Sequence, residues 1–414
     1  MNHIIIWVIS FLAIAGVIIR PFKVTEAIYA VSGAGMLLIL QMIKPLDAIS
    51  GVAKGIDVYL FLIGMMLLAE TAREEKLFDW LAAHATRMAK GSSARLFLLI
   101  YIVGVVVTTF LSNDATAVVL TPAVAAAARS AKVRNPLPYL LICAFIANAA
   151  SFVLPISNPA NLVIYGSKMP SLLHWLSLYL IPSICAIVVT YFMLYITQRK
   201  CFKDKIATEI ILPDLSPGGK TAFIGIGATA AVLLFASAID IQLGLPTAVT
   251  GIITTGIVLL KAKKSPLIVI KGVSWAVLPL VAGLFIIVEA LSKTGLVQHL
   301  TGALNTAISH SSTGAVWLSG SAVAIACNLM NNLPAGLIAG NVIQNAHAPE
   351  LIKSSVLIGI DLGPNLSVTG SLATILWIVA LRRENQEVSA WTFLKLGSVI
   401  MTSALIAALA SLFI

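Results

Sequence analysis

Amide, hydroxyl and carboxylic acid side chains gather at four places in stretches of sequence that are otherwise apolar. The four clusters are Ser112, Asn113, Asp114 and Thr116; Ser151, Pro155, Ser157, Asn158, Pro159 and Asn161; Asn328, Asn331, Asn332 and Pro334; and Asp361, Gly363, Pro364, Asn365, Ser367, Thr369, Gly370 and Ser371. Amides and hydroxyls both donate and accept hydrogen bonds. A carboxylate removed from water favours its protonated form. Together these groups could hold a small polyhydroxylated or oxyanion-like solute and carry a proton.

The composition indicates where these clusters must lie. Of the 414 residues, 59% are hydrophobic and only 11% are charged, whereas a soluble globular chain carries roughly 25% charge. This excludes a soluble enzyme, a disordered chain and a disulfide-framed domain, and it predicts an all-α polytopic membrane protein. The net charge of +10 then indicates basic cytoplasmic loops rather than a nucleic-acid partner.

The apolar stretches divide into ordinary spans and two longer segments. A spanning helix needs about 20 apolar residues. The segments 94–128 and 313–345 are too long for one span, and each has a polar cluster midway, so we predict two re-entrant hairpins. The other two clusters predict breaks within helices over 136–165 and 353–381. The remaining expected spans are 3–19, 24–42, 56–70, 172–198, 220–239, 244–260, 273–290 and 391–414.

A faint internal repeat relates the two halves of the chain. The segments around Glu70 and Glu289 are similar and lie 219 positions apart, and those that begin at Ala147 and Ile360 lie 213 apart. The predicted repeats are residues 1–198 and 220–414, joined by a cytoplasmic linker at 199–219. Each contains five spans and one hairpin. An odd number of spans inserts the second copy upside down, with the broken helices meeting at mid-membrane.

Lysine and arginine predict the orientation. On this assignment, 22 of the 27 basic residues fall in one set of loops, which includes 71–95, 199–219 and 382–390. The positive-inside rule makes that set cytoplasmic. Both termini then lie outside a bacterial-type inner membrane. The first hairpin enters from the cytoplasm and the second from the outside.

The predicted positions of the polar residues in the membrane suggest their roles. Asp114 and Asp361 are the predicted proton-coupling residues, because ionisable groups inside a membrane are costly and are usually functional. Asp114 could equally cap the helix that follows it, and any single Ser, Thr or Asn could simply join two helices. Glu70 and Glu289 lie at span ends, where solvation at the interface is the better explanation. The predicted solute-binding residues are Ser112, Asn113, Thr116, Ser157, Asn158, Asn161, Asn331, Asn332, Asn365, Thr369 and Ser371.

Four motifs in this order resemble those of the ArsB-type arsenite efflux permeases, in the wider ion transporter superfamily. The motifs are LSNDATAVVLTP at 111–122, SNPANL at 157–162, NNLPAGL at 331–337 and DLGPNLSVTGSLATILW at 361–377. The resemblance implies export of arsenite and antimonite by alternating access in exchange for protons. It also implies an ArsA-type ATPase partner in some members. Arsenite at neutral pH is mostly an uncharged trihydroxy acid, which suits amide and hydroxyl ligands. Membrane lipids surround the chain, and the oligomeric state, a homodimer included, stays open.

Three other classes remain to be weighed. A sodium/proton antiporter on the same scaffold could hold sodium on carbonyl and amide oxygens, and facing hairpins could form a channel-like pore. An enzyme is disfavoured because no HExxH or GxSxG motif occurs. The GGKT at 218–221 has Asp214 where a Walker A motif needs its first glycine, so we expect no ATP hydrolysis by this chain.

The four cysteines, Cys143, Cys185, Cys201 and Cys327, form no metal or redox motif. We therefore expect no metal and no cofactor. Cys327 precedes the second hairpin tip and could ligate trivalent arsenic, which prefers thiolates. No second thiol lies near it in the sequence, so we expect that it is not required.

Overall fold

The computed structural model describes residues 2–20, 24–166, 169–210 and 212–414. Within these residues the regular structure is helical, and the β-type pairing consists of one isolated bridge between Ser92 and Lys205. Seven of the described helical segments are long and apolar enough to cross a membrane, or eight if the bent pair formed by residues 45–53 and 56–74 counts as one span. This confirms the prediction of an all-α chain with many apolar spans.

Among its described residues, the first half of the chain contains eleven α-helices and a π-helical segment at Thr116–Leu120. The α-helices are α1 (Asn2–Ile19), α2 (Glu26–Ile39), α3 (Pro45–Ala53), α4 (Ile56–Glu74), α5 (Leu77–Met88), α6 (Ser93–Phe110), α7 (Asn113–Ala115), α8 (Thr121–Ser130), α9 (Leu137–Ala149), α10 (Pro159–Tyr165) and α11 (Leu172–Gln198).

The second half presents the same order of long, short and broken helices. They are α12 (Pro217–Ala238), α13 (Gly244–Ala262), α14 (Pro266–Gly272), α15 (Val277–Ser292), α16 (Leu296–His310), α17 (Ser312–Met330), α18 (Asn332–Asn345), α19 (Glu350–Leu362), α20 (Leu372–Arg383) and α21 (Ala390–Ala410). This recurrence supports the internal repeat, while the inverted relation of the copies stays a prediction. The short helices α3 and α14 were not predicted as separate elements.

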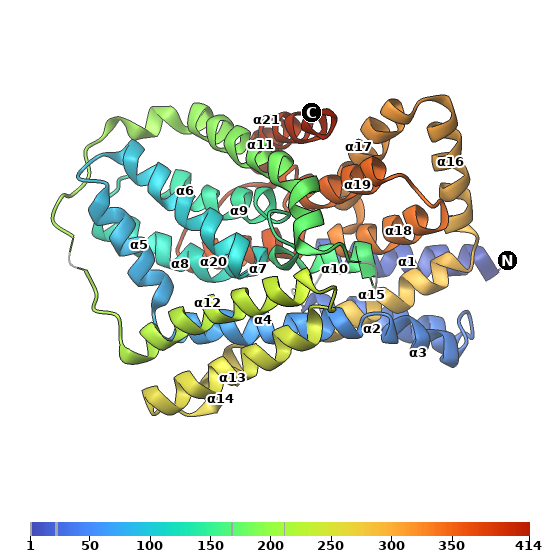
Figure 1. Cartoon of the computed structure of the whole chain (residues 1–414), viewed down its shortest axis with the longest axis horizontal. Helices are drawn as coiled ribbons and strands as arrows, with labels where there is room; N and C mark the ends of the chain where they lie inside the picture. The colour runs from blue at the N-terminus through green and yellow to red at the C-terminus, as the bar shows by residue number, and fades with distance from the viewer. Residues whose placement is uncertain (1, 21–23, 167–168, 211) are drawn as a thin grey trace.

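The two halves are interleaved rather than side by side. Helix α4 packs along α13 and α15 packs along α2, so each pair joins one helix from each half (Figure 1). Gly64 brings α4 against the backbone of α13 at Thr247, and Gly283 brings α15 against α2 at Ala30. Gly64 and Gly283 lie 219 positions apart. Small residues permit such close approach of helices in a membrane.

The chain leaves α-helical geometry inside both of the segments, 136–165 and 353–381, that were predicted to be broken. Between α9 and α10 it is irregular over 150–158, which contains Pro155, and between α19 and α20 it is irregular over 363–371, which contains Gly363 and Pro364. The flanking helices α9, α10, α19 and α20 have 13, 7, 13 and 12 residues. None is long enough to cross a membrane alone. These four helix ends therefore lie inside the protein.

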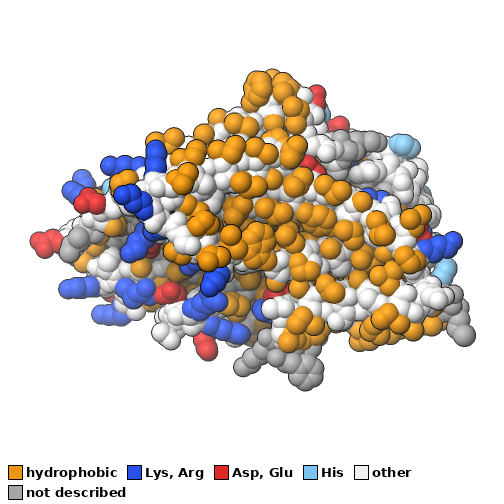
Figure 2. All heavy atoms as spheres, turned by 90° about the horizontal axis from the view of Figure 1, so that it is seen from below, with side chains coloured by type: hydrophobic (Ala, Val, Ile, Leu, Met, Phe, Trp, Pro, Cys, Tyr) orange, Lys and Arg blue, Asp and Glu red, His pale blue; other side chains and the backbone are white. Residues whose placement is uncertain are grey.

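The surface carries the amphipathic signature of a chain in a bilayer. Figure 2 shows hydrophobic side chains across the middle of one face, with Lys and Arg gathered toward one end of the molecule. Exposed apolar residues of α12 and α13 such as Phe223, Phe235 and Ile252 are 56–66% accessible. In Figure 1 that end holds α5 and the segment between α11 and α12. Basic residues at one end and an apolar belt beside them are typical of membrane proteins.

Candidate functional site

Each of the four polar clusters supplies the residue that caps the next helix. The side chains of Ser112, Asn158, Asn331 and Ser371 accept hydrogen bonds from the first backbone N–H groups of α7, α10, α18 and α20. Asn331 adopts a positive φ of 74° at the tip between α17 and α18. The N-terminus of a helix attracts negative charge and offers free N–H groups. The cap of α7 is Ser112, so Asp114 is free of the capping role that the sequence left open for it.

Asp361 is a buried carboxylate without a cationic partner. It lies at the end of α19 and is 0% exposed. Its Oδ1 accepts a hydrogen bond from Asn158 Nδ2 across the interface between the halves. Its Oδ2 has no hydrogen-bond partner among the described residues, although the Ser151 side chain lies nearby. None of the ion pairs among these residues includes Asp361.

A second interaction between the halves centres on Asn148, which the sequence analysis missed. Its Nδ2 donates to Asn365 Oδ1 at 3.0 Å and to Thr374 Oγ1 at 3.4 Å. Its Oδ1 accepts from Ser371 Oγ at 3.4 Å. Asn365 is also held by the carbonyl of Phe145 at 3.0 Å. Asn148 lies inside an uninterrupted apolar run, so no Pro or Gly beside it indicated a special role.

The second hairpin tip is bound to the second break by a network around Asn328. Asn328 donates to the Gly363 carbonyl at 2.9 Å and accepts from Ser367 Oγ at 2.7 Å. Thr369 Oγ1 donates to the Asn328 carbonyl at 3.1 Å, and Asn332 N donates to the Gly370 carbonyl at 2.9 Å. Predicted residues Asn332 and Thr369 therefore lie together, with Asn328 between them.

Other predicted residues make hydrogen bonds inside the first half. Thr116 pairs with Thr108 at 2.8 Å, and Asn113 Oδ1 accepts from Asp114 N at 2.9 Å. Ser157 donates to the Thr109 carbonyl at 3.0 Å. Asn161 donates to the Ser151 carbonyl at 3.0 Å, whereas its Oδ1 is buried without a partner. These side chains brace the first tip and the first break.

Two cavities lie at opposite ends of α10. The smaller, about 80 Å³, is lined by Ser112, Asp114, Glu70 and, at the start of α10, Pro159. Asp114 is partly exposed there. The larger, about 990 Å³, reaches Gly166 just beyond the end of α10. The predicted solute-binding residues do not line this larger cavity, and Ser112 is the one that lines the smaller.

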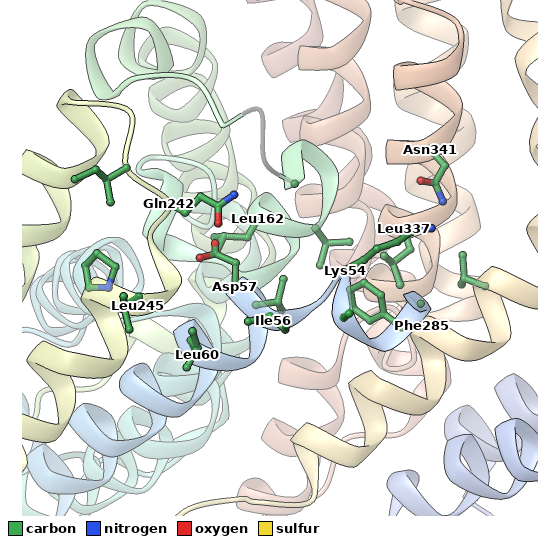
Figure 3. A pocket seen from close by; sticks show the side chains of 18 of the residues that line it. Lys54, Ile56, Asp57, Leu60, Leu162, Gln242, Leu245, Phe285, Leu337 and Asn341 are labelled. Atoms are coloured by element: carbon green, nitrogen blue, oxygen red, sulfur yellow. The ribbon is translucent and has the colours of Figure 1, made fainter. Parts of the chain in front are cut away.

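Among the residues that the structure describes, the charged ones that line the large cavity are Lys54, Asp57 and Glu289. Lys54 Nζ pairs with Glu289 Oε2 at 2.8 Å, and Asp57 Oδ1 accepts from Gly244 N at the start of α13 at 2.7 Å. Figure 3 shows Asp57 and Gln242 near one another, with Lys54 and Phe285 on the other side. The described part of this lining therefore carries one more acidic than basic residue. Glu70, at the small cavity, pairs with Arg73.

Residues 11–364 match the family described as "Citrate transporter" (CitMHS). The chain is 28% identical over 361 residues to the "Arsenical pump membrane protein" of Yersinia enterocolitica, with 84% of each chain covered. It is 27% identical, with the same coverage, to the protein of that name from Escherichia coli strain K12.

Two solved transporter structures share the fold. The YdaH transporter of Alcanivorax borkumensis gives a TM-score of 0.58 at 13% identity, covering 88% of this chain and 86% of that one. MtrF of Neisseria gonorrhoeae, described as one of a class of antimetabolite efflux pumps, gives a TM-score of 0.57 at 12% identity and covers 100% of this chain and 94% of that one. At these identities the likeness concerns the fold alone.

Proposed function

The chain belongs to the CitMHS family of multi-pass membrane transporters, and on that premise we propose that it exports arsenite and antimonite from the cytoplasm in exchange for protons. The curated relatives are named arsenical pumps, which supports a role in arsenical resistance. The observation that carries the proposal is Asp361, a buried carboxylate whose hydrogen-bond partner is an amide and which forms no ion pair with the described residues.

The charges of the cavities favour an uncharged solute over a tricarboxylate. Citrate carries several negative charges and would need Lys or Arg that is not already paired. Asp57 and Glu289 line the large cavity, and its Lys54 pairs with Glu289. Asp114 and Glu70 line the small one. Like charges repel a polyanion, whereas a trihydroxy acid meets the amide and hydroxyl groups that it can bond.

Proton exchange supplies the driving force that a neutral solute lacks. A neutral solute gains nothing from the membrane potential, so export against a gradient requires a coupled ion. A buried carboxylate without a cation is stable mainly when it is protonated. Asp361 would release its proton when the site opens to the cytoplasm, and bound solute would then permit the change to the outward-facing state. Reprotonation of Asp361 from the outside would permit the return. Asp114 would share this work at the first hairpin tip.

Alternating access would move the solute between the two cavities along α10. The cavities border opposite ends of that helix and also opposite ends of α4, at Asp57 and Glu70. The larger is on the side with few basic residues, which the positive-inside rule assigns to the outside. Rocking of one set of helices against the interleaved α2, α4, α13 and α15 would enlarge one cavity and close the other.

The proposal is tested by arsenite accumulation in cells that lack their own arsenite export. Expression of this chain should lower steady-state intracellular arsenite and antimonite severalfold and raise the arsenite concentration that stops growth. Radiolabelled citrate uptake and sodium tolerance, measured in the same cells, should not change. Sodium tolerance without arsenite tolerance would instead identify a sodium/proton antiporter. Citrate uptake without arsenite export would identify a citrate transporter, in agreement with the description of the family.

A further inference from the structure

The hydrogen bonds that cross between the two halves are related by the internal repeat more clearly than the residue types are. Asn148 and Asp361 are 213 positions apart, and so are Asn158 and Ser371. Asp361, at the end of α19, bonds Asn158, the cap of α10. Asn148, at the end of α9, bonds Ser371, the cap of α20. Each half therefore reaches across to the helix start of the other, and the two contacts are equivalent.

The two equivalent contacts differ in charge. One end residue is a carboxylate and the other is an amide. The amide makes more bonds, because its Nδ2 also reaches Asn365 and Thr374. Asn148 is 0% exposed, so losing it would leave Asn365 Oδ1 without the hydrogen bond that Asn148 supplies, and would take one partner from the Thr374 hydroxyl. Buried polar groups without partners are costly.

We propose that Asn148 is a positioning residue for the solute site: it holds Asn365 and the start of α20 in place as the permanently neutral counterpart of Asp361. This inference rests on the proposed transport function. The contact between Asn158 and Asp361 would then change with protonation of Asp361. The contact between Ser371 and Asn148 would stay constant and fix the geometry of the second break. Asn148 need not touch the solute for this role.

The first test measures arsenite counter-exchange in proteoliposomes with equal pH on both sides. Asn148→Ala should raise the KM for arsenite by at least about tenfold, while the maximal rate per inserted transporter changes less than about twofold. The matched control is Ser183→Ala on α11, whose buried hydroxyl has no hydrogen-bond partner among the described residues. That control should leave both constants unchanged. An unchanged KM in inserted Asn148→Ala protein would overturn the inference.

A second variant keeps the test decisive if Asn148→Ala fails to insert. Thr374→Val keeps the shape of the side chain and removes the hydroxyl that contacts Asn148 and, at 2.9 Å, Ser371. It should raise KM severalfold. In the double variant the KM should be no higher than in Asn148→Ala alone, since contacting residues are not additive. Failure of Thr374→Val to change KM, with or without a usable double variant, would count against the inference.

A readout without substrate separates this inference from the transport proposal. Hydrogen exchange of the backbone over 363–374 should speed up in Asn148→Ala or Thr374→Val and stay as in wild type in Ser183→Ala. If wild-type protein moved no arsenite, the proposed function would fail, and faster exchange would still support the Asn148 contact. Unchanged exchange in both variants would refute the contact itself.

Discussion

At the scale of single residues, the helix breaks and the hydrogen bonds across them have different physical origins. Pro155, Gly363 and Pro364 stop helices for covalent and steric reasons that act locally, so the breaks are readable from one chain. The pairing of Asn158 with Asp361, and of Asn148 with Asn365, joins residues more than 200 positions apart. Such pairs depend on how whole helices pack. Asn148 was missed because nothing local distinguishes it from a helix-packing amide.

The cysteines provide a residue-scale prediction about how arsenic is held. Cys327 is fully buried, and its Sγ lies 3.8 Å from the Ile360 carbonyl. The nearby candidate ligands are therefore oxygen atoms rather than a second thiol. Cys327→Ala should keep most arsenite efflux, at least about half of the wild-type rate, because hydroxyl-directed hydrogen bonds are sufficient. Efflux from cells is measured, with insertion checked by immunoblot. Complete loss of efflux in correctly inserted protein would instead show that the Cys327 thiolate binds arsenic.

At the scale of elements, two glycines near the α3–α4 and α14–α15 junctions face glutamates of the other half. Gly272, the last residue of α14, has the Glu70 carboxylate against it, and Gly51 of α3 has Glu289 Cβ 3.3 Å from where its own Cβ would stand. Glu70 is held by Arg73, whose Nε donates to its Oε2 at 2.8 Å. A Cβ at Gly272 would therefore overlap a carboxylate that Arg73 holds in place, whereas a Cβ at Gly51 would stand only a few tenths of an ångström closer than ordinary van der Waals contact.

Gly272→Ala should accordingly reduce the amount of folded transporter more than Gly51→Ala does. Overpacking of this kind costs about 1–3 kcal/mol, so the midpoint of thermal unfolding in detergent should fall by several degrees for Gly272→Ala. Gly51→Ala is the matched control and should stay close to wild type. Equal stability of both variants would show that Glu70 moves away freely and that α14 is not fixed there.

The helices themselves divide into those that hydropathy indicates and those that it does not. Long apolar runs in the sequence predict α11, α12 and α13, because a helix that spans a bilayer needs about 20 apolar residues. The short α5 and α16 lie between longer helices and carry mixed faces, so average hydropathy hides them. The bend between α3 and α4 falls at Gly55, just before the predicted span 56–70, and α3 itself lies in a stretch that was expected to be a loop.

At the scale of the whole molecule, the charge distribution yields a topology that can be checked chemically. Asp214 is exposed in the segment before α12, toward the basic end, and Asn305 is exposed on α16. In a background without the native cysteines, Asp214→Cys should resist a membrane-impermeant maleimide in intact cells, and Asn305→Cys should react. Permeabilised cells should label both. Labelling of Asp214→Cys in intact cells would reverse the proposed orientation.

The central claim is that arsenite moves outward as protons move inward through Asp361 and Asp114. Arsenite uptake into everted membrane vesicles with an acidic lumen tests it most directly. Wild-type vesicles should accumulate arsenite above the external concentration and lose it when the pH gradient is collapsed. Asp→Asn keeps the size and removes titration, so neutralising the coupling acid by Asp361→Asn or Asp114→Asn should abolish accumulation while arsenite exchange persists. Full gradient dependence in both variants would contradict the account.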